Sequence, residues 1–180
     1  LRFRIGPDTF FQSNTAQAEK LFTRVRELAV LHGRPAVALD LFAGTGPIAL
    51  HLAAAADRVI AVESWEPSVA AARENLALNE IQNVDILAAD VNDALPPGLP
   101  EAVDLVVVDP PRPGLSPEAI AWIGKLAPAT ILYVSCNPAT LARDLKLFHQ
   151  APYRVEAVEP FDLFPHTFHM ETLVLLRRNG

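Results

Sequence analysis

Five short apolar runs alternate with helical segments along this chain, and this order restricts the possible folds more than any other feature of the sequence. Each run is rich in Val, Ile, Leu or Ala and has the length of a strand: 36–42, 58–63, 84–90, 104–109 and 130–135. Strands that alternate with helices form a parallel sheet whose two faces are both covered. The sequence therefore predicts an α/β protein with a doubly wound sheet.

The segments between these runs carry the signals of helices. Residues 15–31 repeat apolar side chains at helical spacing. Ser116 and Asn137 are residue types that cap helix starts, and each precedes a proline, which the first helical position tolerates. We expect helices over 15–31 and 47–56, followed by one that has Pro67 in its first turn and ends at about residue 79. Two more are expected, one from 117 onward and one over 138–149.

Two further strand-like segments follow the last helix, at 153–161 and 170–178. We expect them to form an antiparallel pair that closes a mostly parallel, seven-stranded sheet. The proline-rich stretches at 96–100 and 110–117 indicate loops within one domain rather than linkers. All 180 residues are thus expected to form one domain with a short lead-in over 1–14.

The composition is that of a globular protein, with 51% hydrophobic and 20% charged residues. No apolar run reaches the roughly 20 residues that span a bilayer, and charges interrupt the N-terminus before a signal-peptide core can form. The single cysteine cannot form an internal disulfide. We therefore expect a reducing, cytoplasmic setting without a membrane.

The net charge of −6 argues against an extended nucleic-acid surface on this chain, because acids outnumber bases 21 to 15. Binding to a polyanion normally draws on Lys and Arg. If the protein acts on nucleic acid, we expect that another part of a longer protein grips it. The initial Leu in place of Met favours the same interpretation.

The loop after the first strand has the character of a cofactor pocket. Asp40 lies near the strand end and is followed by Gly44 and Gly46, which let the backbone turn tightly and approach a ligand. Glu63 ends the second strand, where nucleotide-binding folds place the acid that binds ribose. Asp90, at the end of the third, is a candidate acceptor for an adenine amino group. The glycines alone leave a dinucleotide site or an ordinary turn open.

Two chemical groups follow the fourth and fifth strands. Pro110 and Pro111 hold the backbone rigid just beyond Asp109, which suits recognition of a planar base, although a plain turn has the same pattern. Cys136 immediately precedes the predicted cap Asn137, and the partial positive charge of a helix start is expected to lower the pKa of its thiol. The alternative for Cys136 is a small buried apolar residue.

The tail at 161–171 contains His166 and His169, but two histidines without a third ligand are weak evidence for a metal. We therefore expect no metal site. Glu171 begins the last strand, where its position alone indicates an ordinary surface acid.

Five segments together resemble the RNA 5-methyluridine (uracil-C5) methyltransferases. They are FFQSN at 10–14, DLFAGTG at 40–46, DPPRPG at 109–114, LYVSCNP at 132–138 and FDLFPHTFHME at 161–171. The similarity extends over almost the whole chain, and the last three motifs are highly specific. The resemblance implies the catalytic domain of a class I, Rossmann-like methyltransferase that uses S-adenosylmethionine on a uridine in transfer or ribosomal RNA.

The resemblance also implies roles for single residues. Cys136 would be the nucleophile that attacks C6 of uracil, and Glu171 the base that removes the C5 proton. Asp109 and Arg112 would belong to the loop that holds the uracil. Residues implied to bind the cofactor are Gln12, Phe42, Gly44, Glu63, Asp90 and Asp109.

The chain departs from the family in several ways. Members usually carry an N-terminal RNA-binding barrel and often an insert with an iron–sulfur cluster, and neither is present here. Ala43 replaces a common cysteine, and Pro47 stands where some members offer an asparagine to the cofactor. Two alternatives therefore stay open: a methyltransferase for an exocyclic amine or another small acceptor, and a cofactor-binding domain that cannot hold RNA.

Overall fold

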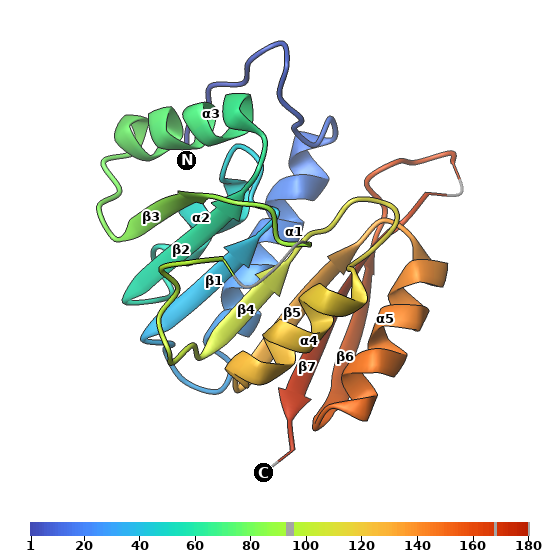
Figure 1. Cartoon of the computed structure of the whole chain (residues 1–180). Helices are drawn as coiled ribbons and strands as arrows, with labels where there is room; N and C mark the ends of the chain where they lie inside the picture. Colours follow the sequence, from blue (N-terminus) through green and yellow to red (C-terminus); the bar gives the residue numbers. More distant parts are fainter. Residues whose placement is uncertain (93–95, 168, 180) are drawn as a thin grey trace.

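The computed structural model describes residues 1–92, 96–167 and 169–179. A seven-stranded sheet in the order β3-β2-β1-β4-β5-β7-β6 forms its centre (Figure 1). The strands β1 to β5 pair in parallel, whereas β7 is antiparallel to both of its neighbours. The strands are β1 (Val37–Leu41), β2 (Arg58–Glu63), β3 (Val84–Ala88), β4 (Leu105–Val108), β5 (Thr130–Ser135), β6 (Tyr153–Phe161) and β7 (Glu171–Arg178). The predicted doubly wound fold is confirmed.

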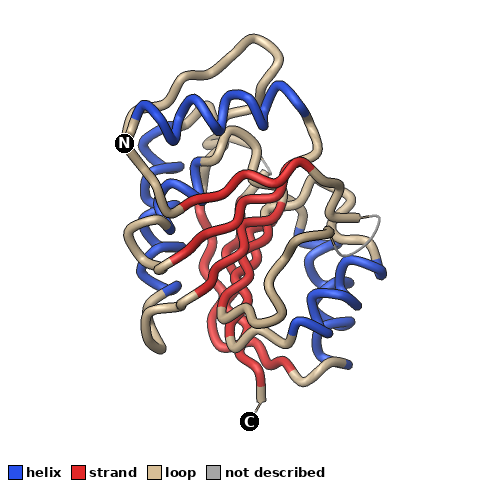
Figure 2. Tube along the Cα trace, turned by 60° about the vertical axis from the view of Figure 1, so that its left-hand side comes forward, coloured by secondary structure: helices blue, strands red, loops and turns tan. Residues whose placement is uncertain are grey.

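Helices cover both faces of this sheet (Figure 2). They are α1 (Thr15–Ala29), α2 (Pro47–Leu52), α3 (Glu66–Leu78), α4 (Pro117–Leu126) and α5 (Pro138–Gln150). One apolar core forms between the sheet and α1, α2 and Leu76 of α3, and a second forms between the sheet and the helices α4 and α5.

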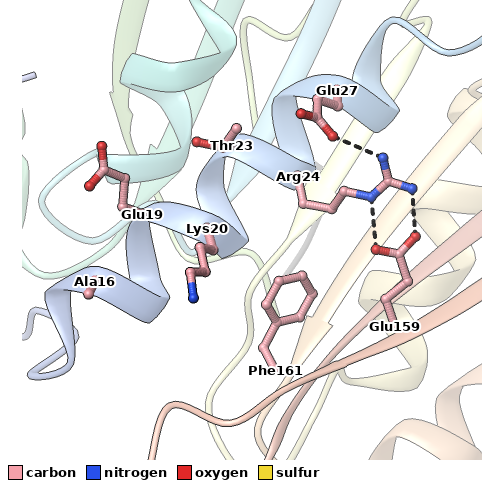
Figure 3. A pocket seen from close by; sticks show the side chains of 8 residues that line it. All are labelled: Ala16, Glu19, Lys20, Thr23, Arg24, Glu27, Glu159 and Phe161. Carbon is pink, nitrogen blue, oxygen red and sulfur yellow. Dashed lines mark hydrogen bonds and ion pairs between the residues drawn. The ribbon is translucent and has the colours of Figure 1, made fainter.

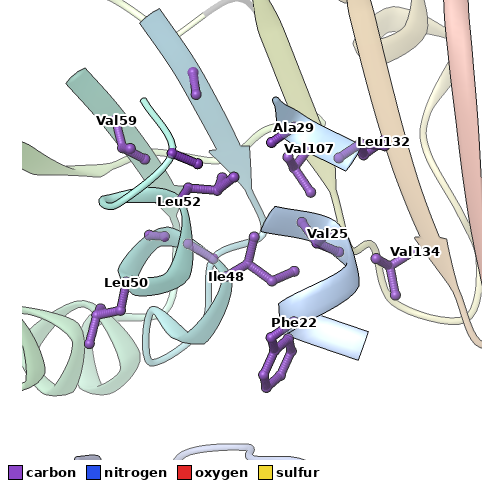
Figure 4. Close-up of a cluster of buried hydrophobic side chains, with 14 of the residues drawn as sticks. Phe22, Val25, Ala29, Ile48, Leu50, Leu52, Val59, Val107, Leu132 and Val134 are labelled. Carbon is purple, nitrogen blue, oxygen red and sulfur yellow. The ribbon is translucent and has the colours of Figure 1, made fainter. Parts of the chain in front are cut away.

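The middle strands are apolar throughout because each of their faces borders one of these cores. In β5, Leu132 and Val134 point to the α1 side, where Figure 4 shows Leu132 near Ala29. Tyr133 belongs to the core on the opposite side. Alternate side chains of a strand point to opposite faces, so a sheet buried on both faces needs apolar residues at successive positions.

Several elements end earlier than the sequence indicated. The second helix ends at Leu52 rather than residue 56, and in the turn that follows, the Leu52 carbonyl accepts hydrogen bonds from the backbone N–H groups of Ala55 (2.8 Å) and Ala56 (2.9 Å). The first helix similarly ends at Ala29, and β3 ends at Ala88. The predicted caps are confirmed: Ser116 accepts from Ala119 N, and Asn137 from Ala139 N.

The order of the strands determines where a ligand can bind. The chain moves outward from β1 to β2 and β3, and then returns to β4 on the other side of β1. Ligands of doubly wound sheets bind beyond the carboxyl ends of the strands at this switch point. Because β7 runs in the opposite direction to β5, its first residue lies at the same end of the sheet.

Substituting Leu132→Ala tests the packing of the central strands. Leu132 is fully buried, so the lost contacts and the resulting cavity should lower the free energy of unfolding by about 2–5 kcal/mol in urea denaturation. As a control, Val158→Ala on the edge strand β6, where the side chain is 57% exposed, should change it by less than about 0.5 kcal/mol. Equal losses in the two variants would contradict this description of the core.

Candidate active site

The loop after β1 leaves room for a ligand beside an acid from β2. Gly44 has a positive φ of 55°, and a Cβ atom placed there would meet nothing within 4 Å. Its backbone N–H donates to Glu63 Oε2 at 2.9 Å, and the other oxygen of Glu63 accepts from Trp65 N at 2.7 Å. Phe42 also has a positive φ, 63°, which is strained for a residue with a side chain and is typical of functional loops.

The lead-in that contains Gln12 is fastened along α3. Asn79 Oδ1 accepts from Arg2 N at 2.9 Å, and Asn75 Oδ1 accepts from Arg4 N at 2.6 Å. Gln12 is only 8% exposed, yet its Oε1 has no hydrogen-bond partner among the described residues. Buried polar atoms are normally paired, so this amide oxygen is available to a ligand.

The third predicted acid lies slightly further from the sheet than expected. Asp90 follows β3 by two residues rather than ending it, and its side chain is exposed. Asp90 Oδ1 accepts a hydrogen bond from Asn92 N at 2.8 Å, which stabilises the turn beyond the strand. One carboxylate oxygen therefore holds this turn, at the carboxyl end of the sheet.

Three carboxyl groups form a row across the carboxyl end of the sheet. Asp40 lies in β1, Asp109 follows β4, and Glu171 begins β7. Burial raises the pKa of Asp109 to about 8, with a further contribution from the nearby charge of Glu171. Burial, followed by the charge of Asp109, raises the pKa of Asp40 well above its ordinary value. Neighbouring acids in such surroundings favour their protonated forms.

Asp40 is the member of this row that sequence reasoning left without a role. The side chain is completely buried, and neither of its oxygens makes a hydrogen bond of good geometry in the described part of the chain, although the backbone of Ala49 lowers its pKa. An acid near a strand end was visible in the sequence, but its burial depends on the packing of α2 against β1. The unpaired carboxyl is a further polar group beside the glycine loop.

Cys136 and Glu171 meet because of the pairing between β5 and β7. Ser135 pairs with Thr172 in this register, so the residue after β5 lies beside the residue that starts β7. Glu171 is 3% exposed, and its Oε2 lacks a partner among the described residues, so the expectation of an ordinary surface acid is wrong. Burial raises the pKa of Glu171.

The expected lowering of the Cys136 pKa is also wrong. Burial raises the pKa of this half-buried thiol, and the charges of Glu171 and Asp109 raise it further, while Arg112 acts in the opposite direction. A backbone hydrogen bond at Cys136 itself also lowers the pKa but does not outweigh the effects that raise it. The resting thiol therefore keeps its proton more firmly than a free cysteine does.

The loop after β4 faces the tail that leads into β7. The side chain of Arg112 is exposed, and its guanidinium lies 3.3 Å from His169 Nε2. The charge of Arg112 also lowers the pKa of Cys136. The structure thus brings the predicted Asp109, Arg112, Cys136 and Glu171 together.

A hollow of about 680 Å³ lies elsewhere, between α1 and β6 (Figure 3). Arg24 spans its wall and binds Glu159 through two hydrogen bonds of 2.8 Å, and it also contacts Glu27 at 2.9 Å. The cations that line the hollow, Lys20 and Arg24, are thus accompanied by acids. Phe161 also forms part of the lining. None of the predicted site residues contributes to this hollow.

Within the described residues, no helix is long and apolar enough to cross a membrane. The same part of the chain contains no group of three or more His, Cys, Asp or Glu side chains arranged to hold a metal ion.

The fold and the strand-end site define the class I S-adenosylmethionine-dependent methyltransferase architecture. The N-methyltransferase NodS of Bradyrhizobium japonicum has the same fold, with a TM-score of 0.77 over 94% of this chain and all of its own, at 16% identity. The chain matches the tRNA (Uracil-5-)-methyltransferase family over residues 1–94 and 101–179, and it belongs to that family.

Relatives and a solved structure agree with this assignment. An uncharacterised RNA methyltransferase of Caldanaerobacter subterraneus is 42% identical over 99% of this chain, and one of Thermotoga maritima is 42% identical over 97%. The chain spans 39% of the length of each. The tRNA (uracil-54, C5)-methyltransferase of Pyrococcus abyssi, solved with S-adenosyl-L-homocysteine, aligns with a TM-score of 0.84 and 34% identity over 97% of this chain and 41% of its own.

The raised pKa of Asp109 predicts a pH-dependent stability. Its folded-state pKa of about 8 lies above the ordinary 3.8, so between these values the folded protein holds a proton that the unfolded chain releases. The free energy of unfolding should therefore fall as the pH rises from about 4 to about 8, by up to about 1.4 kcal/mol per pH unit. Urea denaturation across this range measures the slope.

Asp109→Asn should remove the part of this pH dependence of the free energy of unfolding that Asp109 causes, because the amide does not titrate. The same substitution at Asp162, which is exposed, controls for the loss of one negative charge. If the slope is the same with and without Asp109, its burial is not the cause.

Proposed function

We propose that this protein transfers a methyl group from S-adenosylmethionine to C5 of a uridine in transfer or ribosomal RNA. The observation that carries the proposal is the placement of Cys136 beside the buried Glu171, by the register of β5 and β7, at the cofactor end of the sheet. A nucleophile and a base in contact with one reacting ring are what this reaction requires.

The residues around the glycine loop fit S-adenosylmethionine. The unpaired Oε1 of Gln12 is a free acceptor, the space above Gly44 admits a ligand, and Glu63 stands where an acid binds ribose hydroxyls. Phe42, Asp90 and Asp109 complete the proposed cofactor residues. The bound S-adenosyl-L-homocysteine of the Pyrococcus abyssi relative supports this assignment. When bound, S-adenosylmethionine supplies a methyl group carried by a positively charged sulfur.

Cys136 solves the chemical difficulty of the acceptor, since C5 of uracil is a poor nucleophile. The sulfur of Cys136, once deprotonated, forms a bond to C6, and the electron pair of the C5–C6 double bond passes into an enolate. C5 then becomes nucleophilic and takes the methyl group, while the electron pair of the broken S–CH₃ bond would stay on the cofactor's sulfur and leave it a neutral thioether. The raised pKa of the thiol keeps Cys136 protonated and slow to react before RNA arrives.

Glu171 completes the reaction by removing the remaining proton from C5. The electron pair of the broken C5–H bond restores the C5–C6 double bond, and the sulfur of Cys136 leaves C6 with the electron pair of the S–C6 bond. Burial raises the pKa of Glu171, which brings it closer to neutral pH and so makes the carboxylate a stronger base. Asp109 and Arg112 hold the uracil from the loop after β4.

The uridine must leave its stack to enter this site, which favours loops and single-stranded regions of RNA. The net charge of −6 supplies little attraction for the phosphate backbone. We therefore assign most of the grip on RNA to a part of the full-length protein outside these residues. A free, half-buried thiol as nucleophile needs reducing conditions, and so we propose a cytoplasmic enzyme.

RNA that contains 5-fluorouridine tests the nucleophile. The full-length protein, incubated with this RNA and S-adenosylmethionine, should form a covalent adduct on Cys136, because fluorine at C5 does not leave as a proton does. Denaturing mass spectrometry detects the adduct, and Cys136→Ala should form none. An adduct on another residue, or none despite measured binding of RNA and cofactor, would overturn the proposal and favour a different acceptor.

Glu171→Gln tests the base with unmodified RNA. Removing a general base typically lowers the rate about 10²- to 10⁴-fold, and the loss here should fall after the methyl transfer. The variant should therefore accumulate the methylated Cys136 adduct, seen in the same mass spectra, while the wild type releases it. Full turnover in the variant would exclude Glu171 as the base.

A further inference from the structure

The loop over residues 110–115 is poor in hydrogen-bond donors. Pro110, Pro111 and Pro113 have no N–H group, so the loop presents several carbonyl oxygens for few amide hydrogens of its own. One of the few amide groups of the loop, the N–H of Gly114, donates to Pro111 O at 2.8 Å. The remaining carbonyl groups depend on donors from elsewhere.

One face of α5 supplies these donors. Arg112 O accepts from Asn137 Nδ2 at 3.2 Å and from Thr140 Oγ1 at 3.1 Å. The guanidinium of Arg143 donates to Pro113 O at 2.8 Å and to Leu115 O at 3.0 Å. Residues three or four positions apart share a helix face, which explains why these side chains all reach the same loop.

Asp144 joins the loop to β5 as well. It is completely buried, and its Oδ2 accepts from Leu115 N at 2.8 Å and from the hydroxyl of Tyr133 at 2.7 Å. Its Oδ1 accepts from Arg143 Nε at 2.8 Å. A buried carboxylate is tolerated only when it is paired and hydrogen-bonded, and both oxygens of this one are.

Gly114 shows how closely the loop is packed against this pair. A Cβ atom on Gly114 would lie 2.5 Å from Asp144 Oδ2 and 2.8 Å from Arg143 NH2, closer than such atoms approach in proteins. The backbone conformation, with φ of 77°, also favours glycine. The loop and α5 therefore fit together only without a side chain at this position.

The two ends of this connection belong to the proposed active site. The loop follows Asp109 and contains Arg112, while α5 begins directly after Cys136 and its cap Asn137. We propose that Arg143 and Asp144 are positioning residues, which lock the uracil-binding loop to the helix behind the nucleophile so that base and thiol keep a reactive geometry. This inference rests on the function proposed above, because it assigns the loop to the RNA base.

Arg143→Gln in the full-length protein tests the proposal. The glutamine cannot contact two carbonyl groups and a carboxylate at once, so the loop should loosen while the glycine loop after β1 stays in place. The rate of adduct formation with 5-fluorouridine RNA should fall on the order of 10- to 100-fold, since small misplacements cost this much. The affinity for S-adenosylmethionine should stay within about twofold.

Hydrogen–deuterium exchange gives a readout that does not depend on the reaction. Exchange in the 110–116 peptide should become at least about tenfold faster in Arg143→Gln, and exchange in the 40–46 peptide should not change. Arg24→Gln is the matched control, because Arg24 also binds a carboxylate and bridges two elements, but on the α1 side of the sheet. It should alter neither the loop exchange nor the adduct rate.

Two alanine substitutions at glycines separate backbone strain from contact with the pair. Gly98 also has a positive φ, 87°, but a Cβ atom there meets nothing within 4 Å. Gly114→Ala should reproduce the effects of Arg143→Gln, and Gly98→Ala should not. If Arg143→Gln does not fold, Arg143→Lys, which keeps the charge but loses the planar fork, replaces it with the same expectations.

The outcomes distinguish the two proposals. A wild-type protein without any adduct contradicts the proposed function, and the exchange measurements then decide alone whether the pair holds the loop. Unchanged exchange and adduct rate in Arg143→Gln would overturn the positioning role. An equal loss of cofactor affinity and adduct rate would show general damage to the fold and would overturn it too.

Discussion

The antiparallel pairing of β7 with β5 is the interaction on which the site depends. Parallel strands bring only their carboxyl ends to the switch point, and their amino ends lie at the opposite edge. By reversing direction, β7 brings the first residue of a strand, Glu171, to the end of β5 beside Cys136. A shift of this register by one residue would turn Glu171 to the other face of the sheet. The apolar residues of β7, which are buried on both faces, hold the register in place.

The carboxyl end of the sheet gathers acidic groups at an energetic cost. Asp40, Asp109 and Glu171 are all removed from water to some degree, and each has a raised pKa because burial disfavours its charge. Such an arrangement weakens the folded state at neutral pH, and the loss must be offset by the two apolar cores. Departures from the usual pairing of buried polar groups are concentrated here, as is typical of functional sites.

Much of the fold was readable from the sequence because its signals are local. Apolar runs of strand length, prolines at helix starts and the caps Ser116 and Asn137 depend only on neighbouring residues, and they predicted the order of elements correctly. The position of Cys136 and Asp109 at strand ends followed from that order.

The burial of Glu171 and Asp40 could not be read in the same way, since it depends on strands and helices far away in the sequence. The thiol pKa was predicted in the wrong direction for the same reason: the helix start is local, whereas the burial of the thiol and the charges of Glu171 and Asp109, which raise its pKa, depend on distant segments. The contacts of Arg143 and Asp144 with the proline loop likewise join segments about 30 residues apart.

The place of β7 in the sheet also orders the assembly of the site in time. Although it is the final strand in this sequence, β7 lies between β5 and β6 rather than at the edge. Synthesis proceeds from the N-terminus, so the glycine loop, Asp109 and Cys136 emerge from the ribosome well before Glu171. Until the last strand inserts, β5 and β6 have no partner between them, and Cys136 has no Glu171 beside it. A nascent chain thus carries the glycine loop, Asp109 and Cys136 before the residue that lies beside the thiol in the finished sheet.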